Sequence, residues 1–180
     1  MKNLLFVLLL VGGLYAADQS ENRVPSSPLT IYSGGLTIGS LVALNPQLKD
    51  MSNQFLTVSF SNTFHIRDRI DLFLDVEWFG PGANFCTEMG ADFYLTKFQF
   101  SPFYGLGAGV VYLNRAGDNV GPAATMHIGF ELDISEKVQM RFKIPYHVVA
   151  NQSRDQAVGL DMGLLFSKGY KKVKKLEYNR

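Results

Sequence analysis

Cysteine is almost absent from this 180-residue sequence, and charged residues are scarce as well. The single cysteine, Cys86, cannot form a disulfide within the chain, and we expect a small buried residue rather than a reactive thiol. Charged residues make up 18% of the chain, below the roughly 25% usual for soluble domains. The formal net charge of +1 gives no reason to expect a nucleic-acid partner or an acidic substrate.

Long hydrophobic runs are missing too. The apolar stretch from Leu4 to Val11 is much shorter than the ~20 residues that a transmembrane helix needs. It follows Lys2 and is succeeded by the small residues Ala16 and Ala17, which is the pattern of a secretory signal peptide. We therefore predict a signal peptide at 1–17, a flexible periplasmic leader at 18–28 and an exported mature chain.

The sequence does contain a sustained alternation of apolar and polar residues. Leu56, Val58 and Phe60 alternate with Thr57 and Ser59, for example, and this period of two is that of a β-strand. Turn-like residues interrupt the alternation at regular intervals, and no helix is predicted. Eight strands are predicted, at 35–44, 55–66, 70–79, 84–95, 98–113, 122–134, 138–149 and 157–167.

The two faces of these strands differ in size and charge. One face carries bulky apolar side chains such as Leu72, Phe130 and Phe142, whereas the other carries the acids, bases, histidines and most glycines. The interior of an eight-stranded barrel is just wide enough for side chains to fill, so the charged, glycine-rich face fits inside. An apolar exterior of this extent is larger than a soluble monomer tolerates. We therefore predict an all-β, eight-stranded antiparallel up-and-down transmembrane β-barrel over 29–167, with both termini periplasmic.

Two other architectures fit the residues less well. A soluble lipocalin-like barrel that binds an apolar ligand needs the reverse distribution, with apolar residues inside. A two-sheet sandwich would expose the charged, glycine-rich face to water and overfill its core.

Several segments resemble a known family. "FSPFYGLGAGVVYL" (100–113) is similar to the Pro-aromatic-x-Gly-x-Gly strand of small outer-membrane barrels of the OmpA type, and "VGLDMGLLFS" (158–167) is similar to their closing strand. "GFELDISEKVQMRFKIPY" (129–146) resembles one of their hairpins with a short periplasmic turn. The resemblance implies an outer-membrane protein of a Gram-negative-type bacterium, inserted by the barrel insertion machinery and surrounded by outer-membrane lipid.

The C-terminus departs from that family pattern. Members often end on the aromatic residue that the insertion machinery reads, but Phe166 is followed here by a basic tail at 168–180. The tail either contacts anionic lipid or the cell wall from the periplasm, or is simply solvated.

Two groups of residues are candidates for chemistry. His147 lies near the predicted external end of its strand, with Ser153 and Asp155 just beyond it, and a His and a Ser on such a rim serve some barrel enzymes that deacylate or acylate lipid A. Ser61, His65, Asp71 and Asp75 share the interior face of one predicted hairpin. No metal site or cofactor is predicted, because the three histidines lie on different strands without ligand spacing.

We predict a polar network inside the barrel and an aromatic belt outside it. A turn at Ser135–Lys137 sets Asp133 opposite Gln139 and Glu131 opposite Arg141, so that an ion pair forms between the last two. The predicted interior network consists of Glu131, Arg141, Lys143, Asp161 and Asp133. The predicted lipid-facing belt consists of Trp78, Phe93, Tyr104, Tyr112, Tyr146 and Phe166.

The expected function follows from these features. We expect a monomeric outer-membrane protein with a structural, interaction or narrow-pore role in the cell envelope and without covalent chemistry. The alternatives are an enzyme that modifies outer-leaflet lipid and, less in keeping with the pattern, a soluble ligand-binding barrel.

Overall fold

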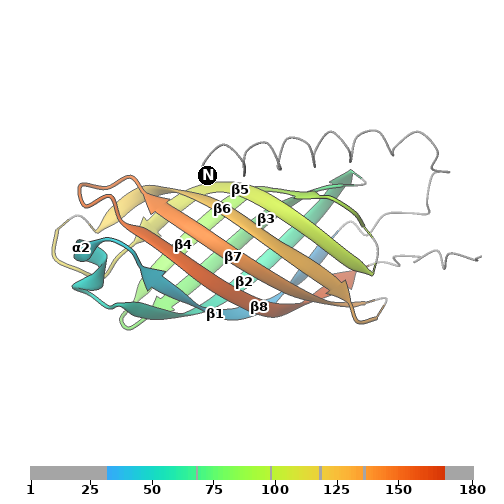
Figure 1. Ribbon diagram of the computed structural model, residues 1–180, viewed down its shortest axis with the longest axis horizontal. Coiled ribbons are helices and arrows are strands. Elements are labelled where there is room, and N and C mark those ends of the chain that lie inside the picture. Colours follow the sequence, from blue (N-terminus) through green and yellow to red (C-terminus); the bar gives the residue numbers. More distant parts are fainter. Residues whose placement is uncertain (1–31, 68, 98, 118, 136, 169–180) are drawn as a thin grey trace, which may run out of the picture.

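Eight consecutive antiparallel strands account for most of the computed structural model, which describes residues 32–67, 69–97, 99–117, 119–135 and 137–168 (Figure 1). The one helix in the described part of the chain is α2 (Pro46–Lys49). The strands are β1 (Tyr32–Ala43), β2 (Gln54–Arg67), β3 (Ile70–Gly80), β4 (Asn84–Tyr94), β5 (Phe100–Tyr112), β6 (Val120–Asp133), β7 (Val138–Val149) and β8 (Gln156–Lys168).

The sheet closes on itself. Each strand pairs with the next one in the chain, and β1 pairs with β8 from Tyr32 opposite Lys168 to Ala43 opposite Ala157. Closure pairs the backbone groups that an open sheet would leave at its edges, which is a requirement for strands within lipid. The prediction of an eight-stranded antiparallel up-and-down barrel is therefore confirmed.

The two ends of the barrel differ in their connections. At the end that holds Tyr32 and Lys168, the connections are short, as at 68–69 and 134–137. The predicted register across 134–137 is present, with Asp133 opposite Gln139 and Glu131 opposite Arg141. Short turns mark the periplasmic side of such barrels, so we call this end, where β1 begins and β8 ends, the periplasmic end and the opposite one the external end.

Two local features differ from the sequence prediction. Strand β1 begins at Tyr32 instead of residue 35, because Ser33 hydrogen-bonds to Ser167 on β8 at 2.8 Å and the ring of Tyr32 contacts Phe64 at 5.5 Å. A helical turn, α2, forms where none was predicted: Pro46 stands at its start, where a fixed φ favours a helix, and Leu48 is buried.

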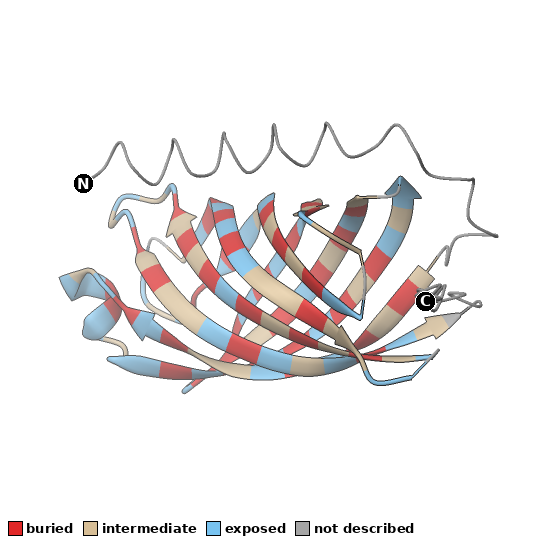
Figure 2. Cartoon of the chain, turned by 45° about the vertical axis from the view of Figure 1, so that its right-hand side comes forward, coloured by how far each residue is buried: buried red, intermediate tan, exposed pale blue. Residues whose placement is uncertain are grey.

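Burial alternates along every strand, as Figure 2 shows by the banding of buried and exposed residues. The outward positions are apolar and well exposed, among them Leu36, Leu56, Leu106, Met126 and Leu160, each more than half exposed. The inward positions include most of the acids, bases and histidines. The assignment of the two faces made from the sequence is confirmed.

Other predictions concern residues that the structure does not cover. The predicted signal peptide (1–17) and leader (18–28) lie outside the described residues, as does the basic tail beyond Lys168. No helix among the described residues is long and apolar enough to cross a membrane.

The outward face gives a first testable prediction. Leu106 lies at the middle of β5 and is 53% exposed, so Leu106→Arg is expected to lower the free energy of unfolding from lipid by about 2–4 kcal/mol. Val120, at the external tip of β6, is similarly exposed, and Val120→Arg is expected to cost about 0–1 kcal/mol because it can reach the interface. Urea unfolding in liposomes measures both. Equal costs at the two positions would contradict the placement of the strands in the bilayer.

Candidate functional site

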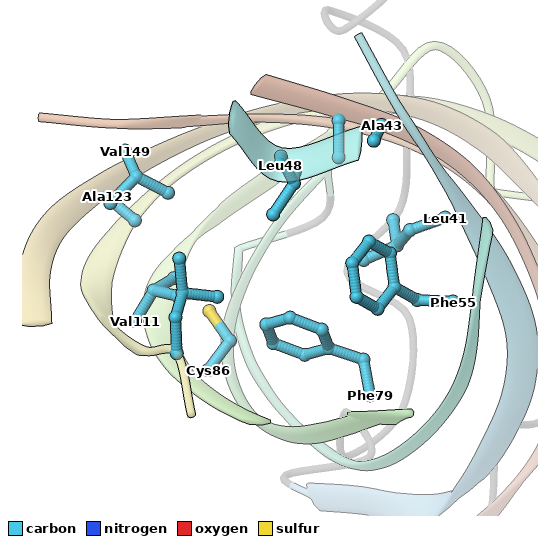
Figure 3. Close-up of a cluster of buried hydrophobic side chains, with 11 residues drawn as sticks. Leu41, Ala43, Leu48, Phe55, Phe79, Cys86, Val111, Ala123 and Val149 are labelled. Carbon is cyan, nitrogen blue, oxygen red and sulfur yellow. The ribbon is translucent and has the colours of Figure 1, made fainter. Parts of the chain in front are cut away.

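The barrel interior is the candidate site, and its external third is closed by apolar side chains. Figure 3 shows these side chains pointing into the space that the strands enclose, with Leu48 reaching in from α2. The rings of Phe55 and Phe79 meet edge to face, with centroids 5.7 Å apart. We call this set the external plug; it comprises Leu41, Ala43, Leu48, Phe55, Phe79, Cys86, Val111, Leu113, Ala123, Val149 and Ala157.

Below the plug, towards the periplasmic end, Arg141 anchors a buried cluster of charges. Its guanidinium donates to Glu131 Oε1 at 3.3 Å, as the sequence predicted, and also to Asp92 across the barrel. The same guanidinium lies over the ring of Phe103, 4.5 Å from its centroid. Because all of these side chains are buried, the pairing offsets part of the cost of removing the charges from water.

Asp92 has a second partner, His127, whose Nε2 lies 2.6 Å from Asp92 Oδ1. This contact passes over Gly105, which lies opposite both residues in the sheet. A Cβ at Gly105 would lie 2.1 Å from His127 Nε2 and 2.3 Å from Asp92 Oδ1. The glycines on the inward face of β5 therefore make room for polar groups to meet across the strand.

A second buried cluster surrounds Lys143. Its ammonium donates to Asp75 Oδ2 at 2.8 Å and lies 4.0 Å from Glu88 Oε1. Asp161 lies opposite Lys143 in the β7–β8 register and accepts a hydrogen bond from Thr57 at 3.0 Å.

The structure thus brings together four members of the predicted network, Glu131, Arg141, Lys143 and Asp161, in two adjacent clusters. Asp133 does not join them. It lies at the periplasmic end, where it accepts a hydrogen bond from Gln139 at 2.8 Å. The sequence prediction missed Asp75 and Asp92, although both were placed on the inward face, because their partners come from distant strands.

The predicted rim triad is not assembled. His147 Nδ1 lies 3.0 Å from Thr125 Oγ1, and its Nε2 has no hydrogen-bond partner among the described residues. Asp155 instead holds the external loops together: its carboxylate accepts from Arg115 and Asn151, each at 2.6 Å. Arg115 also donates to Ser153 at 3.3 Å. The histidine hydrogen-bonds to neither the serine nor the carboxylate, so the structure does not bring His147, Ser153 and Asp155 together as a catalytic triad.

The second candidate set, Ser61, His65, Asp71 and Asp75 on the β2–β3 hairpin, does not form a Ser-His-Asp triad either. His65 Nδ1 contacts the carboxylate of Asp71 and lies 2.6 Å from Lys97 Nζ, while its Nε2 has no partner among the described residues. Ser61 pairs in the sheet with Asp75, whose carboxylate is bound by Lys143. His65, Asp71 and Lys97 form an ion cluster near the periplasmic end of the barrel.

The predicted belt residues occupy outward positions. Phe93 and Tyr104 stack with ring centroids 5.3 Å apart on neighbouring strands, and the hydroxyl of Tyr146 donates to Gln156 at 2.8 Å. Outward positions near the two ends hold Trp78 and Tyr112 at the external side and Phe93 and Phe166 at the periplasmic side.

One cluster was not predicted from the sequence. Cys86 and Glu88 on β4 and His147 on β7 offer ligand atoms within 4.8 Å of one another, all buried. Two inward residues spaced as Cys-x-Glu were visible in the sequence, but the histidine reaches them only because the barrel closes.

The chain matches no protein-family model, and no curated protein resembles it closely in sequence. Solved structures do resemble it. Neisserial surface protein A has a TM-score of 0.59 at 12% identity, over 76% of this chain and 97% of that one. The N-terminal β-barrel domain of Pseudomonas aeruginosa OprF has a TM-score of 0.53 at 13% identity, over 74% of this chain and 97% of that domain.

At these identities the likeness concerns the fold alone. The closed sheet and the order of its strands agree with this likeness of fold. The apolar outer wall is that of a protein surrounded by lipid. The chain has the fold of the small eight-stranded outer-membrane β-barrels, and its wall and its fold together indicate the outer membrane as its location.

Proposed function

We propose that this protein is a closed, non-conducting barrel of the outer membrane. It stabilises the cell envelope through its contacts with lipid and with other envelope components, and it carries out no covalent chemistry. The observation that supports this proposal best is the filled interior. The external plug occupies one end, and the clusters around Arg141 and Lys143 occupy the middle. An eight-stranded barrel has no room for a water channel once such side chains are in place.

The external surface is suited to contacts with other molecules of the envelope over a small area only. Three of the external connections, at 44–53, 113–119 and 150–155, are tied to one another by Asn45, Arg115 and Asp155. The proposed partners are outer-membrane lipid along the wall, the insertion machinery during assembly and the cell wall through the basic tail. A monomer suffices, because the closed sheet leaves no unpaired edge to join.

Location and closure are tested together on the purified protein. We expect the mature chain to fractionate with outer membranes, to resist carbonate extraction and to migrate differently on gels before and after boiling. Added to planar lipid bilayers, it is expected to give no porin-like conductance steps, because the plug and the ion clusters obstruct the interior. Stable, large conductance steps would contradict the closed barrel.

The role itself is tested in cells without the gene. We expect such cells to take up an apolar dye faster than cells that carry it, while the masses of their lipid A species stay unchanged. Complementation with the wild-type protein and with Ser153→Ala is expected to restore the barrier equally. A change in lipid A acylation that the wild type reverses and Ser153→Ala does not would favour a lipid-modifying enzyme instead.

A further inference from the structure

Three buried side chains of different chemistry converge just beneath the external plug. Cys86 and Glu88 lie two residues apart on β4 and so share its inward face, while His147 comes from β7. Their ligand atoms all lie within 4.8 Å of one another. Each residue is nearly inaccessible, with exposed fractions of 2%, 2% and 6%.

The intervening strands leave space for this convergence. Glu88 lies opposite Gly109 on β5, and Gly109 lies opposite Ala123 on β6. Neither residue has a side chain long enough to obstruct the interior, so Glu88 extends across them and accepts a hydrogen bond from Thr125 Oγ1. Thr125 in turn contacts Nδ1 of His147 at 3.0 Å. The threonine thus orients both the carboxylate and the imidazole.

Polar atoms at this place lack partners. Glu88 Oε1 and His147 Nε2 have no hydrogen bond to any described residue, although both are buried. Lys143 approaches Glu88 Oε1 only to 4.0 Å, because its ammonium is bound to Asp75 at 2.8 Å. Buried polar atoms are normally paired, so these two unpaired atoms, each on a member of the cluster, are available to a ligand at this place.

The surrounding charge points to a cation. Asp75, Glu77, Glu88 and Asp161 are buried around Lys143, and Arg141 lies nearby as a second cation. Glu77 Oε1 and Asp161 Oδ2 are also without hydrogen-bond partners in the described part of the chain. Arg141 is itself bound to Asp92 and Glu131, so carboxylates outnumber cations here, and burying them is costly unless they take up protons or further positive charge is bound.

A small cavity lies beside the cluster. It measures about 30 Å³ and is bordered by Cys86, His147 and Glu77 and otherwise mainly by residues of the external plug, while Glu88 does not border it. This volume exceeds the ~10–15 Å³ that a single water-sized particle requires.

We propose that Cys86, Glu88 and His147 form a binding site for a divalent transition metal of the zinc class. Thiolate, imidazole and carboxylate are the ligands of tetrahedral zinc sites, and the thiolate disfavours calcium and magnesium. Two tetrahedral ligands of a zinc ion at ~2.0–2.3 Å lie about 3.3–3.8 Å apart, so the three ligand atoms, now within 4.8 Å of one another, must close by up to about 1 Å when the ion binds. On binding, the thiol of Cys86 releases its proton to solvent, and a water molecule or Glu77 completes the four ligands.

The metal would link β4 to β7 across the interior of the barrel. This structural role does not depend on the envelope function proposed above. The apolar plug shields the site from the external side, so the ion enters most readily while the barrel folds. The experiment therefore refolds the full-length mature protein into detergent with cobalt(II), which replaces zinc and reports its ligands by absorption.

We expect the refolded protein to show the near-ultraviolet charge-transfer band of a cobalt–thiolate bond together with the visible bands of tetrahedral cobalt, and zinc to displace both. Cys86→Ser is expected to abolish the charge-transfer band, and His147→Gln and Glu88→Gln to weaken cobalt binding at least about tenfold. His127→Gln is the matched control, because His127 is equally buried but pairs with Asp92, and it is expected to bind cobalt as the wild type does.

Folding of each variant is checked by its mobility on unboiled gels. If Cys86→Ser fails to fold, the spectra of Glu88→Gln and His147→Gln decide the matter. Absence of the charge-transfer band in the folded wild type, or its loss in His127→Gln to the same degree as in His147→Gln, would overturn the proposal.

Discussion

Arg141→Ala is expected to lower the free energy of unfolding in liposomes by about 3–5 kcal/mol, because it leaves buried carboxylates without their cation. Arg141 contacts Asp92 and Glu131 and covers the ring of Phe103, so one truncation removes two ion pairs and a packing contact. All of these groups are buried, which limits the extent to which water can replace the lost guanidinium.

A double-mutant cycle separates the pairing from the packing. Arg141→Met keeps much of the side-chain volume, and Asp92→Asn keeps the shape of the carboxyl group. Residues in direct contact show coupling free energies of about 0.5–3 kcal/mol, so the double variant is expected to be more stable than the sum of the two single effects. Strict additivity would show that Arg141 and Asp92 do not interact.

The external plug gives the second large effect. Phe55→Ala is expected to lower the free energy of unfolding by about 3–5 kcal/mol, because the ring is buried against Phe79 and leaves a cavity when removed. Phe60→Ala is the control on the same strand: its ring is 49% exposed on the outward face, where lipid fills the space that it leaves. Urea unfolding of both variants in the same liposomes makes the comparison. Equal losses would mean that Phe55 is not part of a packed plug.

Much of the fold was predictable from the sequence, because a barrel of this size imposes one rule on every strand. The alternation of Leu72 with Phe73, or of Phe130 with Glu131, assigns each residue to the inside or the outside. The short turn at 134–137 fixes the neighbouring register, so Glu131 and Arg141 were expected to meet, and they do. These predictions use local spacing only.

Contacts across the barrel were not predictable in the same way. Arg141 reaches Asp92, 49 positions away, and Lys143 reaches Asp75, 68 positions away. Such contacts depend on the stagger of all eight strands and on how far a long side chain extends over glycines such as Gly105. Neither the stagger of the strands nor the reach of a side chain can be predicted from the residue pattern of a single strand.

The external plug and the cluster of Cys86, Glu88 and His147 could not be predicted from the sequence, for a related reason. Phe55 and Phe79 share the inward face with the charged residues, so the pattern alone does not separate an apolar layer from a charged one along the axis. The buried Leu48 belongs to a four-residue helix that is too short to leave a periodic signal. His147 was placed on the inward face near the external end of its strand, as observed, but its approach to Thr125, Cys86 and Glu88 depends on how the closed barrel staggers its strands.

The assignment of the apolar face to lipid and the polar face to a filled interior is tested most directly by fluorescence from two adjacent positions. Trp78 is the only tryptophan in the sequence and points outward, whereas Phe79 points into the plug. In vesicles of brominated phospholipid, the fluorescence of Trp78 in the wild type is expected to be strongly quenched. In the double variant Trp78→Phe/Phe79→Trp, the indole is moved by one residue to the interior and is expected to be protected from quenching. Strong quenching of the variant with protection of the wild type would contradict the account, because it would exchange the two faces of the barrel.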